Sequence, residues 1–235
     1  MTSNLYKHNY RVEGIIETIL RESPDLVALQ ELKKEHVRAI EAQLCQLYPY
    51  RDLRPGRDAE GMGILSRYPL QKVFLHLPAP AANPIQIALI AKDEPFWFIN
   101  AHPRIPRLRL RTSRGVPLPR VDTRERSFDF GTILELIEGL QGPAILAGDM
   151  NMTDQSQEYH LLPPHWHDVY RIVGWGPGLT FPIDAPFFGL HFPFPLFRLD
   201  YIFYRGDWQP QRAWLGKMPG SDHRYLAAEF LLPLR

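Results

Sequence analysis

Short apolar segments constrain the fold of this 235-residue chain more than any other feature. Five of them have the length of a buried strand: DLVALQ (25–30), MGILS (62–66), IQIALIA (85–91), FWFIN (96–100) and AILAG (144–148). Further strand-like segments follow at 198–204, 212–216 and 225–232. None approaches the roughly 18 apolar residues that a membrane span requires. The chain is therefore expected to build sheets inside a globular domain.

Helical periodicity separates the early strands. Apolar residues recur at helical spacing in three stretches: Val12 to Leu20, Val37 to Leu47, and Ile133 to Leu140. The first is expected to end at Ser23-Pro24, because the residue before a proline is pushed out of the α region. Helices and strands alternate early and strands cluster late, with neither an internal repeat nor a linker. This order predicts one α/β domain over residues 1–235, with mixed sheets.

Composition excludes several classes of protein. Hydrophobic residues make up 45% and charged residues 23%, which is ordinary for a globular domain. Cys45 is the one cysteine, so disulfides within the chain and paired-cysteine zinc sites are excluded. The single cysteine and the lack of a signal-peptide pattern favour a cytoplasmic protein. The first residues, MTSNLY, already read as a strand, so an N-terminal extension carrying a membrane tether stays an open alternative.

Two segments depart from the regular pattern. Residues 104–126 contain eight arginines against two acidic residues, a net charge of +6 that leaves −5 for the rest of the chain. With its four prolines, the stretch 103–123 is expected to be a long loop, either simply solvated or able to attract polyanions. Residues 181–197 are rich in phenylalanine and proline, which excludes a regular helix or a central strand.

Polar residues follow or interrupt the predicted strands. Glu31 follows the first of them, His102 follows FWFIN, and Asp149 and Asn151 follow AILAG. Asp200 lies in RLDYIFY, and Ser221-Asp222-His223 precedes the last strand. Strand ends meet at one edge of a sheet, so these side chains are expected to converge on one cleft. Each alone is weak evidence, because acidic residues also cap helices.

The order of these motifs resembles that of the endonuclease/exonuclease/phosphatase superfamily, which includes DNases, abasic-site endonucleases, inositol-phosphate phosphatases and sphingomyelinases. The matching segments are SNLY, PDLVALQE, GMGILSRYPL, NAHP, GDMN, RLDYIF and SDH. They occur in family order from residue 4 to residue 223. The resemblance implies a four-layer α/β/β/α sandwich of two mixed β-sheets flanked by helices.

The resemblance also implies roles for the polar residues. Glu31 would hold a divalent metal, with Asn4 and Asp222 near it or at a second metal position. Asp149, supported by Asn151, would orient or deprotonate the attacking water. His223 would be steadied by Asp200. His102 would contact the phosphate, although many members carry Thr-His-Leu where this chain has NAHP.

Phosphate chemistry agrees with these roles. Positioning and charge neutralisation dominate phosphoryl transfer. Carboxylate and amide oxygens suit Mg²⁺, with Mn²⁺ as a substitute. The leading prediction is a phosphodiesterase of the endonuclease type that cleaves nucleic acid by in-line attack of water. The alternatives are a phosphatase or pyrophosphatase of lipid-linked or small phosphates, a sphingomyelinase-like enzyme, and a phosphate-binding module without activity.

The two irregular segments are candidate substrate-binding segments. Arginines can pair with phosphates and phenylalanines can stack on bases. The candidates are Arg104, Arg107, Arg109, Arg111, Arg124, Phe192 and Phe194. The same residues could instead meet a lipid, or merely cover the end of a sheet. Nucleic acid is the expected partner, no obligate protein partner is evident, and the oligomeric state is open.

Overall fold

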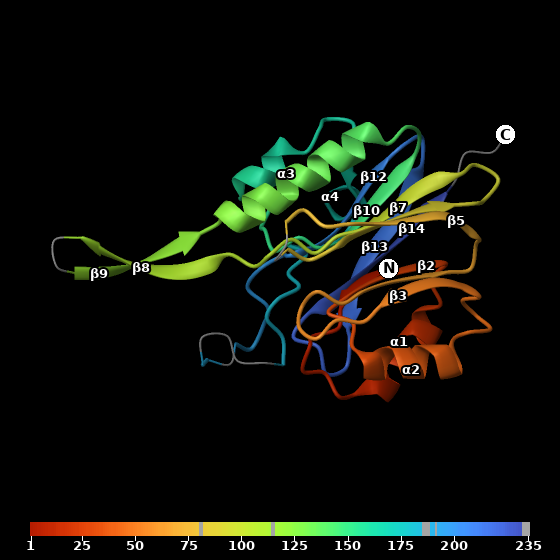
Figure 1. Cartoon of the computed structure of the whole chain (residues 1–235), viewed down its shortest axis with the longest axis horizontal. Coiled ribbons are helices and arrows are strands. Elements are labelled where there is room, and N and C mark those ends of the chain that lie inside the picture. Colours follow the sequence, from red (N-terminus) through yellow and green to blue (C-terminus); the bar gives the residue numbers. More distant parts are fainter. Residues whose placement is uncertain (80–81, 114–115, 185–188, 191, 232–235) are drawn as a thin grey trace.

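Two six-stranded β-sheets pack face to face, with helices on both outer faces (Figure 1). The computed structural model describes residues 1–79, 82–113, 116–184, 189–190 and 192–231, and of residues 110–113 and 116–119 the backbone alone. The four-layer α/β sandwich implied by the sequence is confirmed. No helix within the described ranges is long and apolar enough to cross a membrane.

The first sheet has the strand order β13-β14-β1-β2-β4-β3. Its strands are β1 Thr2–Asn4, β2 Leu26–Gln30, β3 Tyr50–Arg54, β4 Met62–Ser66, β13 Gln209–Lys217 and β14 Arg224–Leu231. The second sheet has the order β11-β12-β10-β7-β6-β5. Its strands are β5 Leu70–His76, β6 Ile85–Ile90, β7 Phe96–Asn100, β10 Ala144–Asp149, β11 His167–Asp168 and β12 Asp200–Arg205. Each sheet has one parallel pair at its centre, β1 with β2 and β7 with β10.

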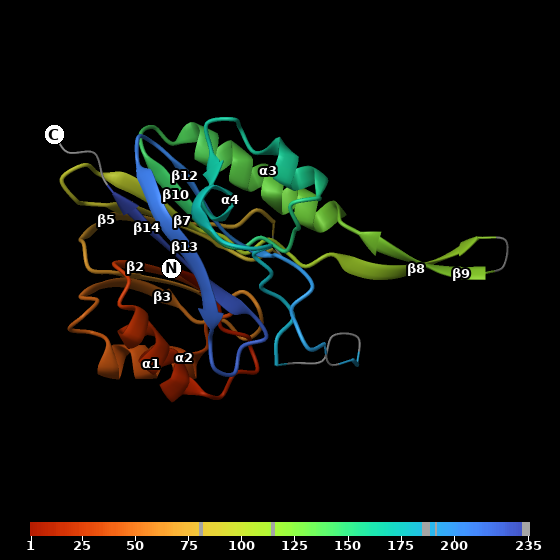
Figure 2. The same ribbon diagram turned by 180° about the vertical axis from the view of Figure 1, so that it is seen from behind.

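Helices cover the outer faces of the two sheets, as the helical spacing of their apolar residues predicts. α1 (Val12–Glu22) and α2 (Lys34–Gln43) cover the first sheet, and α1 buries Ile15, Ile16 and Ile19 against it. α3 (Arg124–Gly139) covers the second sheet and begins well before the apolar spacing that predicts it (Figure 2). A 3-10 helix (Gln157–Leu161) and the short α4 (Val169–Val173) complete the helices of the described chain.

The contact between the sheets is apolar except near one edge. Leu26, Ala28 and Ile64 of the first sheet meet Ala88 and Phe98 of the second in a common cluster. Closer to the edge where β1, β2, β7 and β10 end, a buried polar chain replaces the apolar contacts. Gln30 Nε2 donates to Asn100 Oδ1 at 2.7 Å, and Asn100 Nδ2 donates to Gln86 Oε1 at 3.1 Å. An unpaired buried amide costs free energy, so this hydrogen-bonded row of side-chain amides favours one alignment of the two sheets.

The sequence-based prediction of a long loop over 103–123 is wrong. β8 (Arg107–Ser113) and β9 (Val116–Asp122) form an antiparallel ribbon that projects from the body (Figures 1 and 2). Arginine and leucine alternate from 107 to 110, a period of two that fits a strand. Over 181–197 the expected irregular structure is confirmed for the described residues, which form isolated bridges, such as that between Phe181 and Phe197, and no helix or strand.

Candidate active site

The predicted polar residues gather at one edge of the sandwich. Asn4 ends β1, Glu31 follows β2, and Asp149 ends β10. Asp200 begins the antiparallel strand β12 and pairs directly with Asp149 in the ladder. The parallel pairs end at this edge, and the antiparallel strands start or turn there. Sheet topology therefore brings together residues as distant in sequence as Asn4 and Asp200.

A glycine makes the approach of β10 to the end of β7 possible. A Cβ placed on Gly148 would lie 1.8 Å from the carbonyl oxygen of Ala101. Any side chain here would push apart the two segments that carry Asp149 and His102. The glycine of the GDMN motif is thus required by packing, next to the residues that carry the chemistry.

Asp149 lies at the centre of the site. Its Oδ2 accepts a hydrogen bond from Asn4 Nδ2 at 3.0 Å and faces His102 Nε2 at 3.5 Å and His223 Nε2 at 3.6 Å. Its Oδ1 accepts from the backbone N–H of Asn151 at 2.9 Å. Burial alone raises the pKa of Asp149, but the charge of His223 and the hydrogen bond from His102 outweigh it and hold that pKa at about 2. Asp149 is therefore ionised at neutral pH.

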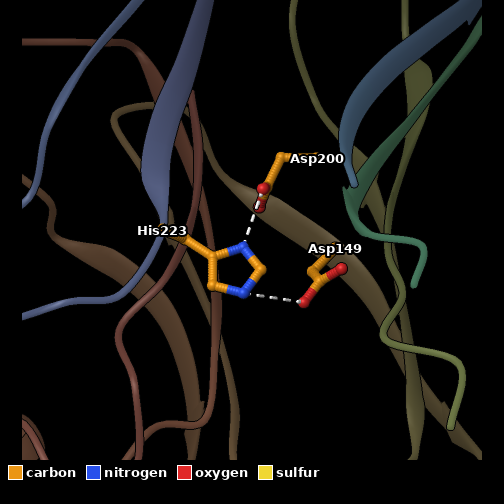
Figure 3. A group of neighbouring side chains, drawn as sticks. All are labelled: Asp149, Asp200 and His223. Atoms are coloured by element: carbon orange, nitrogen blue, oxygen red, sulfur yellow. Dashed lines mark hydrogen bonds and ion pairs between the residues drawn. The ribbon is translucent and has the colours of Figure 1, made fainter. Parts of the chain in front are cut away.

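His223 is held between two carboxylates (Figure 3). Its Nδ1 lies 2.9 Å from Oδ2 of Asp200, which is fully buried, and its Nε2 points to Asp149. Burial lowers the pKa of His223, but the charges of Asp200 and Asp149 outweigh burial and raise it to about 10. The imidazole is therefore protonated at neutral pH and presents N–H groups. The ring of Phe181 packs on it with centroids 4.7 Å apart.

His102 is the second buried histidine. It is 4% exposed, and the amide of Asn83 donates to its backbone carbonyl at 2.9 Å. Burial lowers the pKa of His102, but the hydrogen bond and charge of Asp149 outweigh burial and raise it above the ordinary value. Two buried histidines thus face the Asp149 carboxylate, and both can present N–H groups to a phosphate.

A second group of side chains is acidic. Glu31 accepts from the backbone N–H of Lys7 at 2.7 Å and from Asn4 Nδ2 at 3.2 Å. Glu31 has a φ of 56°, a left-handed conformation that costs a residue other than glycine about 1–3 kcal/mol. Burial raises the pKa of Asp222 to about 6, and the negative charges of Glu31 and Asp149 add to it against the opposing charge of His223. A cation would remove this mutual repulsion.

The donor set fits a divalent metal at Glu31 and Asp222. Their carboxylate oxygens are the hard ligands that Mg²⁺ and Mn²⁺ prefer. Within the described chain, Asp149, Asp200 and His223 also place one ligand atom each within 4.8 Å of one another. We favour the acidic pair, because both nitrogens of His223 face carboxylates and its raised pKa keeps it protonated. Asn4 presents its Nδ2 to the acids while its Oδ1 accepts from Tyr6 N, so here it links the carboxylates.

Asn151 depends on an arginine that the sequence did not indicate. Asn151 adopts a φ of 49°, and its Nδ2 donates to the carbonyl of Pro103 at 3.0 Å. Its own carbonyl accepts from Arg126 Nη1 at 2.8 Å. Arg126 is 7% exposed and forms a two-pronged ion pair with the buried Glu158, at 3.2 and 2.8 Å. Arg126 lies among eight arginines of 104–126, and no local pattern distinguishes it from the exposed ones.

Most of the proposed substrate-binding residues are engaged with acidic neighbours. Arg104 pairs with Asp129, Arg107 with Glu125, and Arg109 and Arg124 both pair with Asp122. Arg111 lies in β8, but its side chain is outside the described part. Phe194 is 63% exposed, and Phe192 is half-buried. Arg104 precedes the ribbon, Arg107, Arg109 and Arg111 lie in β8, Arg124 begins α3, and the two phenylalanines lie in the 181–197 segment.

Comparison with known proteins agrees with this architecture. The Endonuclease/Exonuclease/phosphatase family matches residues 1–223. The chain therefore belongs to this family, whose members are phosphoesterases that depend on a divalent metal. A search of curated proteins gives no match.

Solved structures share the fold at low sequence identity. TDP2 of D. rerio complexed with a single strand DNA product has a TM-score of 0.77 and 19% identity, covering 98% of this chain and 97% of that chain. Truncated TDP2 of Caenorhabditis elegans has 0.74 and 17%, covering 97% and 95%. The endonuclease/exonuclease/phosphatase of Bacteroides vulgatus has 0.71 and 18%, covering 99% and 97%.

Proposed function

We propose that this protein is a Mg²⁺-dependent phosphodiesterase that cleaves nucleic acid. One observation carries the proposal: an ionised Asp149 lies between two histidines with raised pKa values, at the edge where the acidic pair Glu31 and Asp222 also lies. Such a site offers an acceptor for an attacking water, donors for a phosphate, and ligands for a metal. Residues 1–235 together form the catalytic domain in this proposal, and the cytoplasm is its proposed location.

Each side chain has a role that follows from its contacts. Glu31 and Asp222 hold the metal, with Mn²⁺ as a substitute; when bound, the ion polarises a phosphoryl oxygen and stabilises the leaving oxygen. Asp149 accepts a hydrogen bond from the attacking water and orients it. Its pKa of about 2 makes it a poor proton acceptor, so orientation outweighs deprotonation.

The histidines act on the phosphate. His223, kept protonated by Asp200, donates a hydrogen bond from Nε2 to a non-bridging oxygen of the phosphate, and His102 donates a second. Hydrogen bonds from charged donors to developing negative charge strengthen in the transition state. Asn151 holds the loop that follows Asp149, through its bond to Pro103, and Asn4 links Glu31 to Asp149.

Nucleic acid is favoured as substrate by the charge around the site. The +6 stretch of residues 104–126 follows directly after His102. The similar TDP2 structure of D. rerio is complexed with a single strand DNA product, which supports the same substrate class here. Exposed apolar side chains of the 181–197 segment, Phe194 and Leu190, favour a lipid-linked phosphate or a sphingomyelinase-like substrate as the second candidate.

The test is metal-dependent cleavage of DNA. Supercoiled plasmid and a labelled single-stranded oligonucleotide are incubated with Mg²⁺, with Mn²⁺ and with EDTA. Wild type is compared with Asp149→Asn, and the exposed Asp207→Asn serves as the matched control. Metal-dependent cleavage by wild type and the control alone supports the proposal. Phosphate released from small or lipid-linked esters, with DNA intact, would assign the site to the second candidate.

A further inference from the structure

The β8–β9 ribbon is an extension of the active-site edge. Four residues separate His102 from the start of β8, and the helix that follows β9 supplies Arg126 to the Asn151 loop. In both views the ribbon projects away from the two sheets, on the side where the described parts of the 181–197 segment also lie (Figures 1 and 2). A polymer held at the site would therefore pass close to the ribbon.

The register of the ribbon sorts its side chains onto two faces. Residues directly opposite in an antiparallel pair share a face. Arg107 is opposite Asp122 and Arg109 is opposite Arg120, which makes one face basic. Leu108 is opposite Val121 on the other face, and these two side chains are 55% and 60% exposed. The ribbon is thus amphipathic and has a defined cationic side.

Cations exceed anions on the basic face. Arg109 and Arg120 face each other, and like charges directly opposite destabilise a ribbon. Asp122 is shared by Arg109 and Arg124, and Arg120 has no ion pair with any described residue. Arg107 pairs with Glu125 and Arg109 shares Asp122 with Arg124, so Arg120, directly opposite Arg109, is the position that an external anion would stabilise.

The ribbon also lacks a covering layer. An isolated two-stranded ribbon is marginally stable in water, so one that projects from a domain gains from a partner. A second copy of the same basic face would repel it, whereas a polyanion is complementary to it. Arg107 and Arg109 lie two residues apart on a strand, about 6.8 Å, so they form a ladder suited to a row of phosphates rather than to a single anion.

We propose that the basic face of the β8–β9 ribbon, formed by Arg107, Arg109 and Arg120, binds the phosphate backbone of a nucleic-acid strand at positions away from the bond that is cleaved. This deepens the proposed function and rests on it for the identity of the polymer. The ribbon contributes to the affinity for long substrates and leaves the chemistry at Asp149 unchanged.

The experiment compares two triple variants with equal loss of charge. Arg107→Gln/Arg109→Gln/Arg120→Gln alters the ribbon, and Arg11→Gln/Lys34→Gln/Arg38→Gln alters exposed cations around α1 and α2. Binding of a labelled oligonucleotide of about 20 nucleotides, longer than the ~4–16 that one single-strand site covers, is measured by anisotropy in EDTA over a range of salt. Turnover is measured separately with Mg²⁺ on the same oligonucleotide and on bis(p-nitrophenyl) phosphate.

The ribbon variant is expected to flatten the slope of log affinity against log salt by about 2, since each lost single-strand contact removes about 0.7. Its KM for the oligonucleotide should rise with kcat unchanged, and bis(p-nitrophenyl) phosphate should be hydrolysed normally. The α1/α2 variant should match wild type throughout. Equal slopes in all three proteins would overturn the proposal.

Two further outcomes separate the inference from the proposed function. If wild type hydrolyses neither substrate, the proposed function fails, while the salt slopes still decide whether the ribbon binds a polyanion. Vesicles of equal parts phosphatidylcholine and phosphatidylglycerol provide the remaining comparison, because Leu108 and Val121 are exposed. Vesicle binding lost in the ribbon variant, with oligonucleotide binding unchanged, would assign the ribbon to a lipid surface and overturn the proposal.

Discussion

Arg126 contributes both to the stability of the domain and to the geometry of the active site. Its guanidinium forms a two-pronged ion pair with Glu158 and also donates to the carbonyl of Asn151 at 2.8 Å. Glu158 is 4% exposed, and Ser127 Oγ also donates to it at 2.6 Å. Removing one partner of a buried ion pair costs about 3–5 kcal/mol, because the other charge stays buried. Arg126→Met is therefore expected to lower the free energy of unfolding by about that amount.

A double variant separates the two roles. Arg126→Met/Glu158→Leu removes both charges and keeps an apolar volume, which is often neutral to within about 1 kcal/mol or stabilising. Stability should return, but the Asn151 carbonyl still lacks its donor, and its left-handed backbone loses a support. A displacement of about 1 Å near reacting groups can cost about 10²-fold in rate. We expect kcat to stay about 10²-fold low in the double variant.

The assays are urea unfolding and Mg²⁺-dependent hydrolysis of bis(p-nitrophenyl) phosphate. Arg205→Met is the matched control, because Arg205 donates to the carbonyls of Ile137, Leu140 and Gly142 at the other end of α3. It should lose stability and keep its kcat, measured well below its unfolding transition. A wild-type kcat in Arg126→Met/Glu158→Leu would refute the positioning role of Arg126 and leave it a purely structural one.

Three other predictions concern the site and the fold. Asp149→Asn and His223→Ala should each lower kcat on DNA by about 10²–10⁴ with circular dichroism unchanged, and near-normal turnover in either would contradict the assigned roles. EDTA should abolish cleavage and Mg²⁺ restore it; activity persisting after exhaustive chelation would exclude a metal role for Glu31 and Asp222. Burial lowers the pKa of His36, so the unfolded chain takes up a proton first as the pH falls. The contribution of His36 to the free energy of unfolding, measured in urea as the difference between wild type and His36→Gln, should therefore be constant above about pH 6.5 and become less favourable as pH drops below it; equal pH slopes for the two proteins would refute this assignment.

Much of the fold follows from local sequence patterns. The α1 stripe and the apolar strands β2, β4, β7 and β10 are visible as periodicity, because burial on one face imposes it. The sequence does not predict β3 and β5, since both are edge strands whose partly exposed side chains give weak patterns. It does not predict the ribbon either, because prolines and closely spaced arginines are typical of a loop.

The candidate site, like the fold, follows only in part from the sequence. The order of the motifs in the sequence identifies Glu31, His102, Asp149, Asp200 and His223 as candidate site residues. Each lies at or next to the end of a predicted strand, which can be recognised without knowing its contacts in space. Their protonation states could not be predicted from the sequence. A pKa depends on burial and on charges within a few ångströms. The interacting residues can be distant in the sequence: Asp149 and His223 are 74 positions apart.

The sequence by itself determined the chemical groups and the strands that deliver them, since both depend on residue type and local spacing. Only the tertiary structure decided that His223 lies between Asp200 and Asp149, that Arg126 supports Asn151, and that one face of the ribbon is basic. The physical reason is that pairing register and through-space contact are properties of the packed chain. They depend on which distant segments share an edge, and local periodicity carries no information about that.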